Sequence, residues 1–136
     1  MKVKLDPGAY LPERAHRQDA GLDIRSPESV LVPAYGSAVV DTGVHIEIPM
    51  GWTGFLKSKS GLNVKHSITS EGVIDSGYTG GIIVKLYNNS DTAYRVQRGD
   101  KISQLVILPV YLDELEVVEE ISGGERGSGG FGSTGR

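Results

Sequence analysis

Glycine and proline recur so often along this chain that they leave little room for a long helix. The apolar residues between them alternate with polar ones over short runs, as in SAVVDTGVHIEIP, GIIVKLYN and KISQLVILP. Such alternation places the apolar side chains on one face of a β-strand. Several short runs at roughly 8–12 residue spacing are typical of a sandwich, a jelly roll or a barrel. The sequence therefore predicts an all-β domain.

Two segments differ from this pattern. After SKSG, the stretch LNVKHSI has apolar residues at 62, 64 and 68, which predicts one or two turns of helix. From Gly123 onward the chain is rich in glycine and has too few apolar residues to offset the entropy of ordering it. We therefore expect one domain over 1–122, ending in an acidic strand-like stretch, and a flexible arm over 123–136.

Composition excludes several classes of function. A net charge of -3, from 14 basic and 17 acidic residues, gives no broad cationic surface, so we expect no direct binding to nucleic acid. No apolar run approaches the roughly 20 residues of a membrane helix, and the first residues lack the apolar middle of a signal peptide, which predicts a cytoplasmic protein with no membrane contact. The chain has no cysteine, and its dispersed histidines, His16, His45 and His66, predict no zinc site.

The stretch GVIDSGYTGGIIVKLYN has the features of a hairpin, because Ser76 and Gly77 suit a tight reversal between two strands. Two interpretations of it stay open from the residues alone. Asp75 either favours the turn or supplies a carboxylate to a site. Tyr78 is either a half-buried strand aromatic or a ring face for a flat ligand, which the neighbouring glycines would let approach the backbone.

Three further stretches contain candidate polar groups. Ser60 and Gly61 precede the expected helical turn, where they serve either as an anion site beside Lys59 or as a plain helix cap. Gln104 lies among apolar neighbours, where its amide either donates to a phosphoryl oxygen or faces solvent. Asp23 lies within an apolar strand, where it is either buried or directed into a site.

The glycine-rich arm has its own candidates. Arg126 can grip an oxyanion with its guanidinium fork, and Ser133 and Thr134 add hydroxyl donors. Phe131 can cover a flat ring by stacking. The arm is therefore either a simple tail or a lid that becomes ordered over a phosphorylated aromatic ligand.

Taken in order, five of these stretches resemble the five motifs of the homotrimeric deoxyuridine triphosphatase (dUTPase, dUTP diphosphatase) family: AGLDI, SKSGL, GVIDSGYTGGI, RGDKISQL and RGSGGFGSTG. The resemblance implies a distorted jelly-roll, or β-clip, subunit with one short helix after the second motif and a flexible arm. It implies a homotrimer with three sites at subunit junctions, in which the arm of one subunit closes the site of a neighbour. It also implies Mg²⁺-dependent hydrolysis of dUTP to dUMP and pyrophosphate, by attack of water on the α-phosphorus, which supplies dUMP for dTMP synthesis and keeps uracil out of DNA.

The resemblance also assigns roles to residues. Asp75 matches the general base, and Tyr78 matches the tyrosine that packs on deoxyribose and excludes a 2′-hydroxyl. Asp23 matches an aspartate that holds a water of the Mg²⁺ outer shell. The positions matching nucleoside contacts are Thr69, Gly72, Val73, Ile74, Tyr78, Ile83 and Phe131. The positions matching phosphate contacts are Lys59, Ser60, Gly61, Gln104, Arg126, Gly132, Ser133 and Thr134.

Two positions depart from the family pattern. Lys59 stands where the family usually has arginine, which keeps the charge and loses the two-pronged fork. Thr69 stands where an asparagine often contacts the base. The substrate role of both positions is therefore open, but neither change removes the general base, the tyrosine or the arm.

Three other functions are compatible with parts of the pattern. A dCTP deaminase, or its bifunctional relative that makes dUMP directly, resembles this chain around the hairpin but uses an added glutamate and lacks the FGSTG arm. A nucleotide-sensing regulator of a protein partner stays open as a second role, although we find no inserted segment that would host the partner. A purely structural jelly-roll protein would not need Asp75, Tyr78 and the arm at these spacings.

Overall fold

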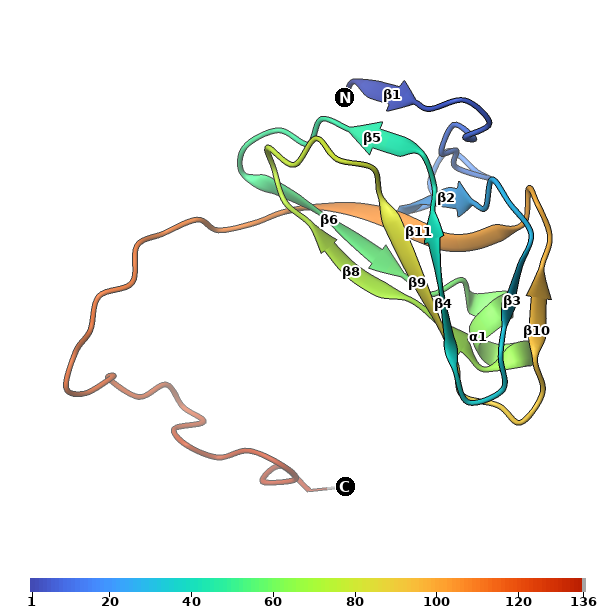
Figure 1. The fold of residues 1–136 in the computed structure, drawn as a ribbon. Coiled ribbons are helices and arrows are strands. Elements are labelled where there is room, and N and C mark those ends of the chain that lie inside the picture. Colours follow the sequence, from blue (N-terminus) through green and yellow to red (C-terminus); the bar gives the residue numbers. More distant parts are fainter. Residues whose placement is uncertain (136) are drawn as a thin grey trace.

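The computed structural model describes residues 1–135, in which short strands form the body and one small helix lies at one end of it (Figure 1). The elements are β1 (Val3–Leu5), β2 (Gly21–Arg25), β3 (Val30–Val32), β4 (Ser37–Asp41), β5 (Val44–Ile46), β6 (Trp52–Lys57), α1 (Ser60–His66), β7 (Ile68–Thr69), β8 (Glu71–Ile74), β9 (Ile83–Asn88), β10 (Tyr94–Val96) and β11 (Lys101–Pro109). No helix among these residues has the length and apolarity needed to cross a membrane.

The strands form two main sheets and two small ones. The larger main sheet has the order β2-β11-β6-β8, and the other has the order β4-β9-β7. The two-stranded sheets pair β1 with β5 and β3 with β10. All these pairs are antiparallel, and neighbours in a sheet are often far apart in sequence, as β2 and β11 are. The expected all-β, jelly-roll-like fold is confirmed.

One hydrophobic core joins the two main sheets. In β9, Val84 and Leu86 point inward while Lys85 and Tyr87 face solvent, which is the alternation that the sequence predicts for a half-buried strand. The core also takes residues from every strand of the larger sheet, and its members are Ile24, Val32, Val40, Val44, Ile46, Ile48, Leu56, Ile68, Ile74, Ile82, Val84, Leu86, Val96, Ile102 and Leu105.

The expected helix is present and begins at Ser60, two residues before the predicted stretch. It ends at Ser67, whose backbone adopts the left-handed conformation (φ 55°, ψ 30°) and so terminates the helix. No residue of α1 is fully buried, and Leu62 makes its contact with the core. A helix this short depends on tertiary packing for its stability.

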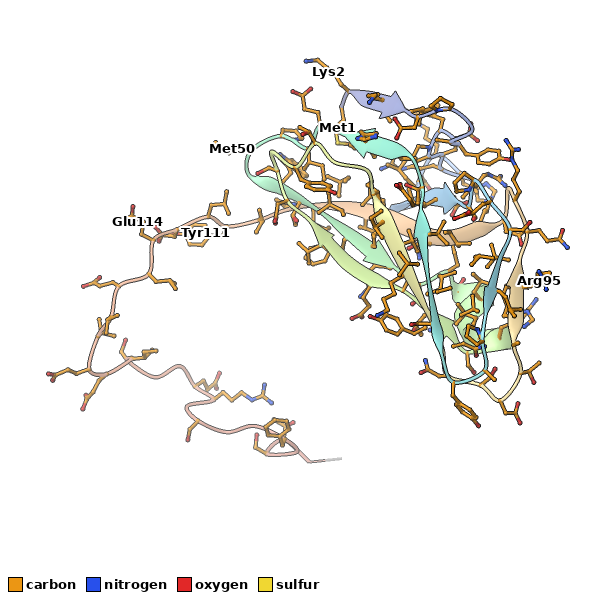
Figure 2. All side chains as sticks on the ribbon, viewed as in Figure 1. Met1, Lys2, Met50, Arg95, Tyr111 and Glu114 are labelled. Atoms are coloured by element: carbon orange, nitrogen blue, oxygen red, sulfur yellow. The ribbon has the colours of Figure 1, made fainter. Side chains whose placement is uncertain are left out.

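The chain leaves the body after β11. The last backbone hydrogen bond to the body runs from the Val110 N–H to the Gly51 carbonyl, at 2.9 Å. Beyond it the segment extends away from the sheets, and Figure 2 shows the Tyr111 and Glu114 side chains on it. The prediction of a strand-like stretch before Gly123 is wrong for the single chain, because no strand follows Pro109 in the part described. Alternation alone cannot make a strand without a partner to pair with.

Candidate active site

Three serines fix the turn that precedes α1. The Ser58 hydroxyl donates to the Ser70 carbonyl at 3.3 Å and accepts from the Ser70 N–H at 3.0 Å. The hydroxyls of Ser70 and Ser103 lie 2.8 Å apart, and Ser103 donates to the Lys57 carbonyl at 3.1 Å. Ser70 and Ser103 are buried. This network holds the end of β6 against β8 and β11, and so fixes where Ser60 begins the helix.

Gln104 lies at the same end of the sheet and is half-buried. Its amide nitrogen donates to the Ser58 carbonyl at 3.0 Å, which ties it to the turn. A register shift in β11 between Lys101 and Ser103 lets the adjacent Ile102 and Ser103 both be buried, which a regular strand would not allow. Gln104 is therefore neither buried nor fully exposed, and one of its amide hydrogens is already bound.

The glycine of the first motif provides space for this amide. A Cβ atom built on Gly21 would lie 2.3 Å from Gln104 Oε1 and 3.1 Å from Gln104 Cβ. Gly21 of β2 pairs with Val106 of β11, the strand that also contains Gln104. The close approach of side chain to backbone explains why a residue without a Cβ stands here.

Asp23 is buried between two cations. Its Oδ1 is bound by Lys59 Nζ, and its Oδ2 lies 2.6 Å from Lys101 Nζ. Burial acts to raise the pKa of Asp23, but the hydrogen bonds from Lys101 and Lys59 outweigh it and hold the pKa below its ordinary value. Asp23 is therefore a buried carboxylate that anchors Lys59 and Lys101 at the edge of the site.

The chain turns at Ser76 and Gly77 as predicted, but the predicted two-stranded hairpin is wrong, because β8 pairs with β6 whereas β9 pairs with β4 and β7 in the other main sheet. The segment 72–83 therefore crosses from one sheet to the other, and we call it the hairpin only for its reversal of direction. Gly77 has φ +83°, a conformation that glycine adopts without strain, and the Tyr78 N–H donates to the Asp75 carbonyl at 3.2 Å. Asp75 is exposed, and its carboxylate has no hydrogen-bond partner among the described residues. Tyr78 is 44% exposed, and its hydroxyl donates to the Gly81 carbonyl at 3.0 Å. The hairpin therefore presents a free carboxylate and a ring face close together in sequence.

The tyrosine ring folds back over the glycines that follow it. A Cβ atom built on Gly80 would lie 2.3 Å from the Tyr78 hydroxyl oxygen and 2.5 Å from Cζ. Val73, on the strand before the turn, is 60% exposed, and Ile83, on the strand after it, is 44% exposed. Gly72 and the buried Ile74 complete the β8 backbone that pairs with β6.

Thr69 lies apart from the hairpin tip. It belongs to β7, opposite Tyr87 of β9. There it lines a hollow of about 650 Å³ whose walls are Lys57, Ser58, Asn63, Thr69, Glu71, Tyr87 and Gln104. In one chain Thr69 therefore lies with Gln104 rather than with Asp75.

The arm residues lie away from both groups. Phe131 and the segment around it are fully exposed, and the backbone hydrogen bonds there stay within the arm, such as Gly129 N–H to the Arg126 carbonyl at 3.0 Å. The predicted contacts of Arg126, Phe131, Gly132, Ser133 and Thr134 with a site are not made within a single chain.

Asp75 and Gln104 lie toward opposite ends of β6. Gln104 pairs with Lys57 at one end, whereas Ile74, the residue before Asp75, pairs with Gly54. Near that other end of β6, the Thr53 hydroxyl donates to the Ile74 carbonyl at 3.1 Å, so Asp75, the next residue, lies there. Four residues along a strand and two strand spacings across the sheet put Asp75 and Gln104 about 16 Å apart. The candidate base and the candidate phosphate contact therefore do not meet within one chain.

Comparison with known proteins supports the resemblance of the motifs. The sequence profile described as dUTPase matches residues 8–135. The chain belongs to the dUTPase family.

Two curated relatives show how complete the dUTPase match is. The deoxyuridine 5'-triphosphate nucleotidohydrolase of Clostridium acetobutylicum is 44% identical over 139 residues, and the match covers 99% of this chain and 96% of the relative. The protein of the same name from Oryza sativa subsp. japonica is also 44% identical, over 99% of this chain and 80% of the relative. The match therefore spans the body and the arm of this dUTPase-family chain.

Solved dUTPase structures share the fold. The dUTPase of Staphylococcus bacteriophage 80alpha with dUPNHPP superposes with a TM-score of 0.93 at 36% identity, covering 99% of this chain and 98% of that one. A dUTPase variant from phage phi11 of S. aureus, described for the coordination of a structural Mg(II) ion, has a TM-score of 0.81 at 34% identity, covering 88% and 96%. These matches confirm the family and its all-β architecture.

In the single chain Asp23 serves as an anchor for two cations. Both of its oxygens bind ammonium groups, from Lys59 and Lys101. Residues 1–135 contain no cluster of three or more histidine and carboxylate side chains that would hold a metal ion directly. The predicted role of Asp23, which is to hold a water of the Mg²⁺ outer shell, needs no such cluster and stays a prediction.

Some of the site's framework was missed from sequence. Lys101 joins the cationic group around Asp23, and Ser58, Ser70 and Ser103 form the buried network. Serines are common in loops, so single serines far apart in sequence gave no signal. The one usable sign was Ser103, a polar residue directly beside Ile102 in an otherwise apolar strand.

Proposed function

We propose that this chain hydrolyses dUTP to dUMP and pyrophosphate, as the family to which it belongs indicates. The observation that carries the proposal is the hairpin, which presents the free Asp75 carboxylate three residues from the exposed Tyr78 ring. That pair can activate water beside a nucleoside sugar. The reaction would supply dUMP for dTMP synthesis and keep uracil out of DNA, and we place it in the cytoplasm.

In this proposal Asp75 is the general base. A base must lie within about 3 Å of the water that it deprotonates, and that water must lie a similar distance from the phosphorus that it attacks. Asp75 is exposed and unpaired among the described residues, so its carboxylate is available to a water. The attack displaces pyrophosphate from the α-phosphorus, and the proton passes to Asp75.

The nucleoside would lie along the hairpin. Tyr78 would pack on the deoxyribose, and the backbone of Gly72, Val73 and Ile74 would read the uracil edge. Val73 and Ile83 are partly exposed, which leaves apolar surface for a flat ring. We keep Thr69 in the proposed nucleoside set only as a residue supplied from the other half of the site.

The triphosphate would lie at the other half. Lys59, held by Asp23, carries a cation beside Ser60 and Gly61, whose N–H groups in the first turn of α1 have no partners inside the helix. Gln104 is held by the Ser58 carbonyl through one amide hydrogen. These groups can neutralise and orient phosphoryl oxygens, which is the main task of a phosphoryl-transfer site.

The separation of the two halves supports a homotrimer. As the general base, Asp75 must lie about 3 Å from the water that attacks the α-phosphorus. Within one chain, however, it lies about 16 Å from Gln104, which we propose contacts the phosphates. The two residues of one site must therefore come from different chains. The segment after β11 also exposes Leu115 and Val117 almost fully, at 99% and 98%, which suits a segment that packs on another subunit. We therefore propose a domain over 1–122 that includes this packing segment.

We further propose that the arm over 123–136 closes a neighbour's site. Arg126, Ser133, Thr134 and the Gly132 backbone would contact phosphates, and Phe131 would stack over uracil. Gly132 has φ +86°, which only glycine adopts freely. Mg²⁺ belongs to the proposal as a property of the family, with the ion neutralising the triphosphate.

The proposal is tested by pyrophosphate release from dUTP, dCTP, dTTP and UTP in the presence of Mg²⁺. The full chain is compared with a truncation ending at Gly124, with Asp75→Asn, and with Asp91→Asn as a matched control in an exposed turn. Release from dUTP alone, retained in the control and largely lost in the truncation and in Asp75→Asn, is the expected result. Ammonia release from dCTP, or full activity without the arm, would contradict it.

A further inference from the structure

A histidine outside the predicted site joins the N-terminal segment to the substrate hairpin. His45 lies on β5, opposite Lys4 of β1. Its Nε2 is 3.0 Å from Asp6 Oδ2, and its Nδ1 is 2.8 Å from the Thr79 carbonyl oxygen. The His45 side chain is 20% exposed, so water has limited access to these contacts. Two ring nitrogens thus bridge two segments that are more than seventy residues apart in sequence.

Both partners of the ring are acceptors. A carbonyl oxygen has no hydrogen to donate, and an ionised carboxylate has none either. A neutral imidazole has one N–H, so it can satisfy one of these contacts while its bare nitrogen faces the other acceptor. Only the doubly protonated imidazolium donates to Asp6 and to Thr79 together.

Thr79 is the residue next to Tyr78. The loop returns to β5 directly afterward, because the Ile82 N–H donates to the Val44 carbonyl at 2.8 Å. Between these points the Tyr78 hydroxyl is bound to the Gly81 carbonyl at 3.0 Å. The His45 contact therefore holds the Thr79 carbonyl, one residue after Tyr78, against β5.

We propose that His45 is a positioning residue for the substrate hairpin, holding the Tyr78 segment in place as an imidazolium bound at once by Asp6 and by the Thr79 carbonyl. This inference rests on the proposed function, since it assigns Tyr78 to the nucleoside. His45 itself touches no reacting atom in this account. Its effect is on how well the hairpin is formed before substrate arrives.

The charges around His45 favour the protonated ring. The hydrogen bond to Asp6 and then the bond to the Thr79 carbonyl hold the pKa of His45 above its ordinary value, against burial and the repulsion of Lys4. Lys4 Nζ lies 3.4 Å from Asp6 Oδ1. The Asp41 carboxylate also lies near the ring, since a Cβ atom built on Gly81 would be 3.1 Å from Asp41 Oδ1 and 3.8 Å from His45 Cε1.

Because the folded-state pKa is raised, the bridge is complete at pH values below the ordinary pKa of histidine. It is lost as pH rises through the folded pKa. The hairpin should therefore loosen toward alkaline pH.

The test combines ring NMR with steady-state kinetics. The ¹⁵N shifts of the His45 ring are titrated in the full chain, with His45→Gln used for assignment and His16 as an internal exposed control. KM and kcat for dUTP are measured between about pH 5.5 and 9 for the wild type, His45→Gln, Asp6→Asn and His16→Asn. Asp6→Asn removes one partner of the ring and leaves His45 itself in place.

We expect the pKa of the His45 ring to lie above the ordinary histidine value, with both ring nitrogens protonated below that pKa. The wild-type KM should rise roughly three- to tenfold as pH increases through that pKa, with a smaller change in kcat. This factor corresponds to about 0.7–1.4 kcal/mol, the net size of one ordinary hydrogen bond. His45→Gln should have the raised KM at every pH, and His16→Asn should follow the wild type.

A singly protonated His45 below about pH 6, or the same KM profile in His45→Gln as in the wild type, would overturn the inference. If the wild type does not cleave dUTP, the proposed function fails separately, and the NMR titration still decides whether the imidazolium bridge exists.

Discussion

The buried carboxylate of Asp23 allows a quantitative test by the substitution Asp23→Asn. Its two oxygens bind Lys59 and Lys101, whose side chains are 26% and 37% exposed. A hydrogen bond to a charged group contributes about 1.5–3 kcal/mol, and partial exposure of the lysines roughly halves this for each bond. The asparagine can accept one bond and turns its amide donor toward the other ammonium. We expect a loss of about 2–3 kcal/mol of unfolding free energy.

This loss should lower Tm by roughly 6–10 °C for a chain of this size, measured by calorimetry at one fixed protein concentration. The control is Glu47→Gln, which removes the exposed Lys2–Glu47 pair (3.2 Å; 87% and 62% exposed) and should change Tm little. Because the folded pKa of Asp23 is below its ordinary value, the stabilisation is present above the ordinary pKa. It is lost as pH falls through the folded pKa.

The difference in Tm between the wild type and Asp23→Asn should therefore be constant near neutral pH and should disappear below about pH 4. An asparagine variant as stable as the wild type at pH 7, or a difference that does not narrow in acid, would refute the view of Asp23 as the anchor of two lysines.

Three glycine substitutions separate stability from activity. Gly54→Ala places a Cβ 2.8 Å from Leu105 Cδ1 in the core and should cost about 1–3 kcal/mol in denaturant unfolding; an unchanged midpoint would show that the core has room. Gly21→Ala should displace the Gln104 amide and lower kcat/KM for dUTP roughly tenfold with a stability change under about 1 kcal/mol, because only a flexible side chain must move. Gly80→Ala should push the Tyr78 ring aside and chiefly raise KM; unaltered kinetics in either variant would argue against the contact it disturbs.

The fold was predictable where the residues of a single strand or turn determine its structure. In the middle of β9, the burial of Val84 and Leu86 and the exposure of Lys85 follow the apolar and polar residues of the sequence, although at its ends Ile83 is exposed and Asn88 is buried. The turn at Gly77 also lies where the motif predicts it. The irregular part of β11 was not predictable, because its register shift buries two adjacent residues, Ile102 and Ser103. The end of β11 at Pro109 was also missed, since the apolar pattern continues into Leu115 and Val117 without a partner strand in the same chain.

The sequence predicts the chemical types at the candidate site positions but not their arrangement. The motifs give the chemical types, such as a carboxylate at Asp75 and an amide at Gln104. Their separation depends on the strand order β2-β11-β6-β8, which pairs elements far apart in sequence. The anchoring of Asp23 by Lys101 needs that same pairing of β2 with β11. Local patterns carry no information on either point.

We propose above that one active site takes Asp75 from one chain and Gln104 from another. The direct test is to unfold Asp75→Asn and Gln104→Ala chains together, refold the equal mixture and measure dUTP hydrolysis against each variant refolded alone. If the chains assort at random, a given site receives an intact Asp75 with a probability of about one half and an intact Gln104 with a probability of about one half. About a quarter of the sites should then be complete, and about a quarter of the wild-type rate should return. A mixture no more active than the average of the two variants would mean that the halves come from the same chain, and would contradict this account.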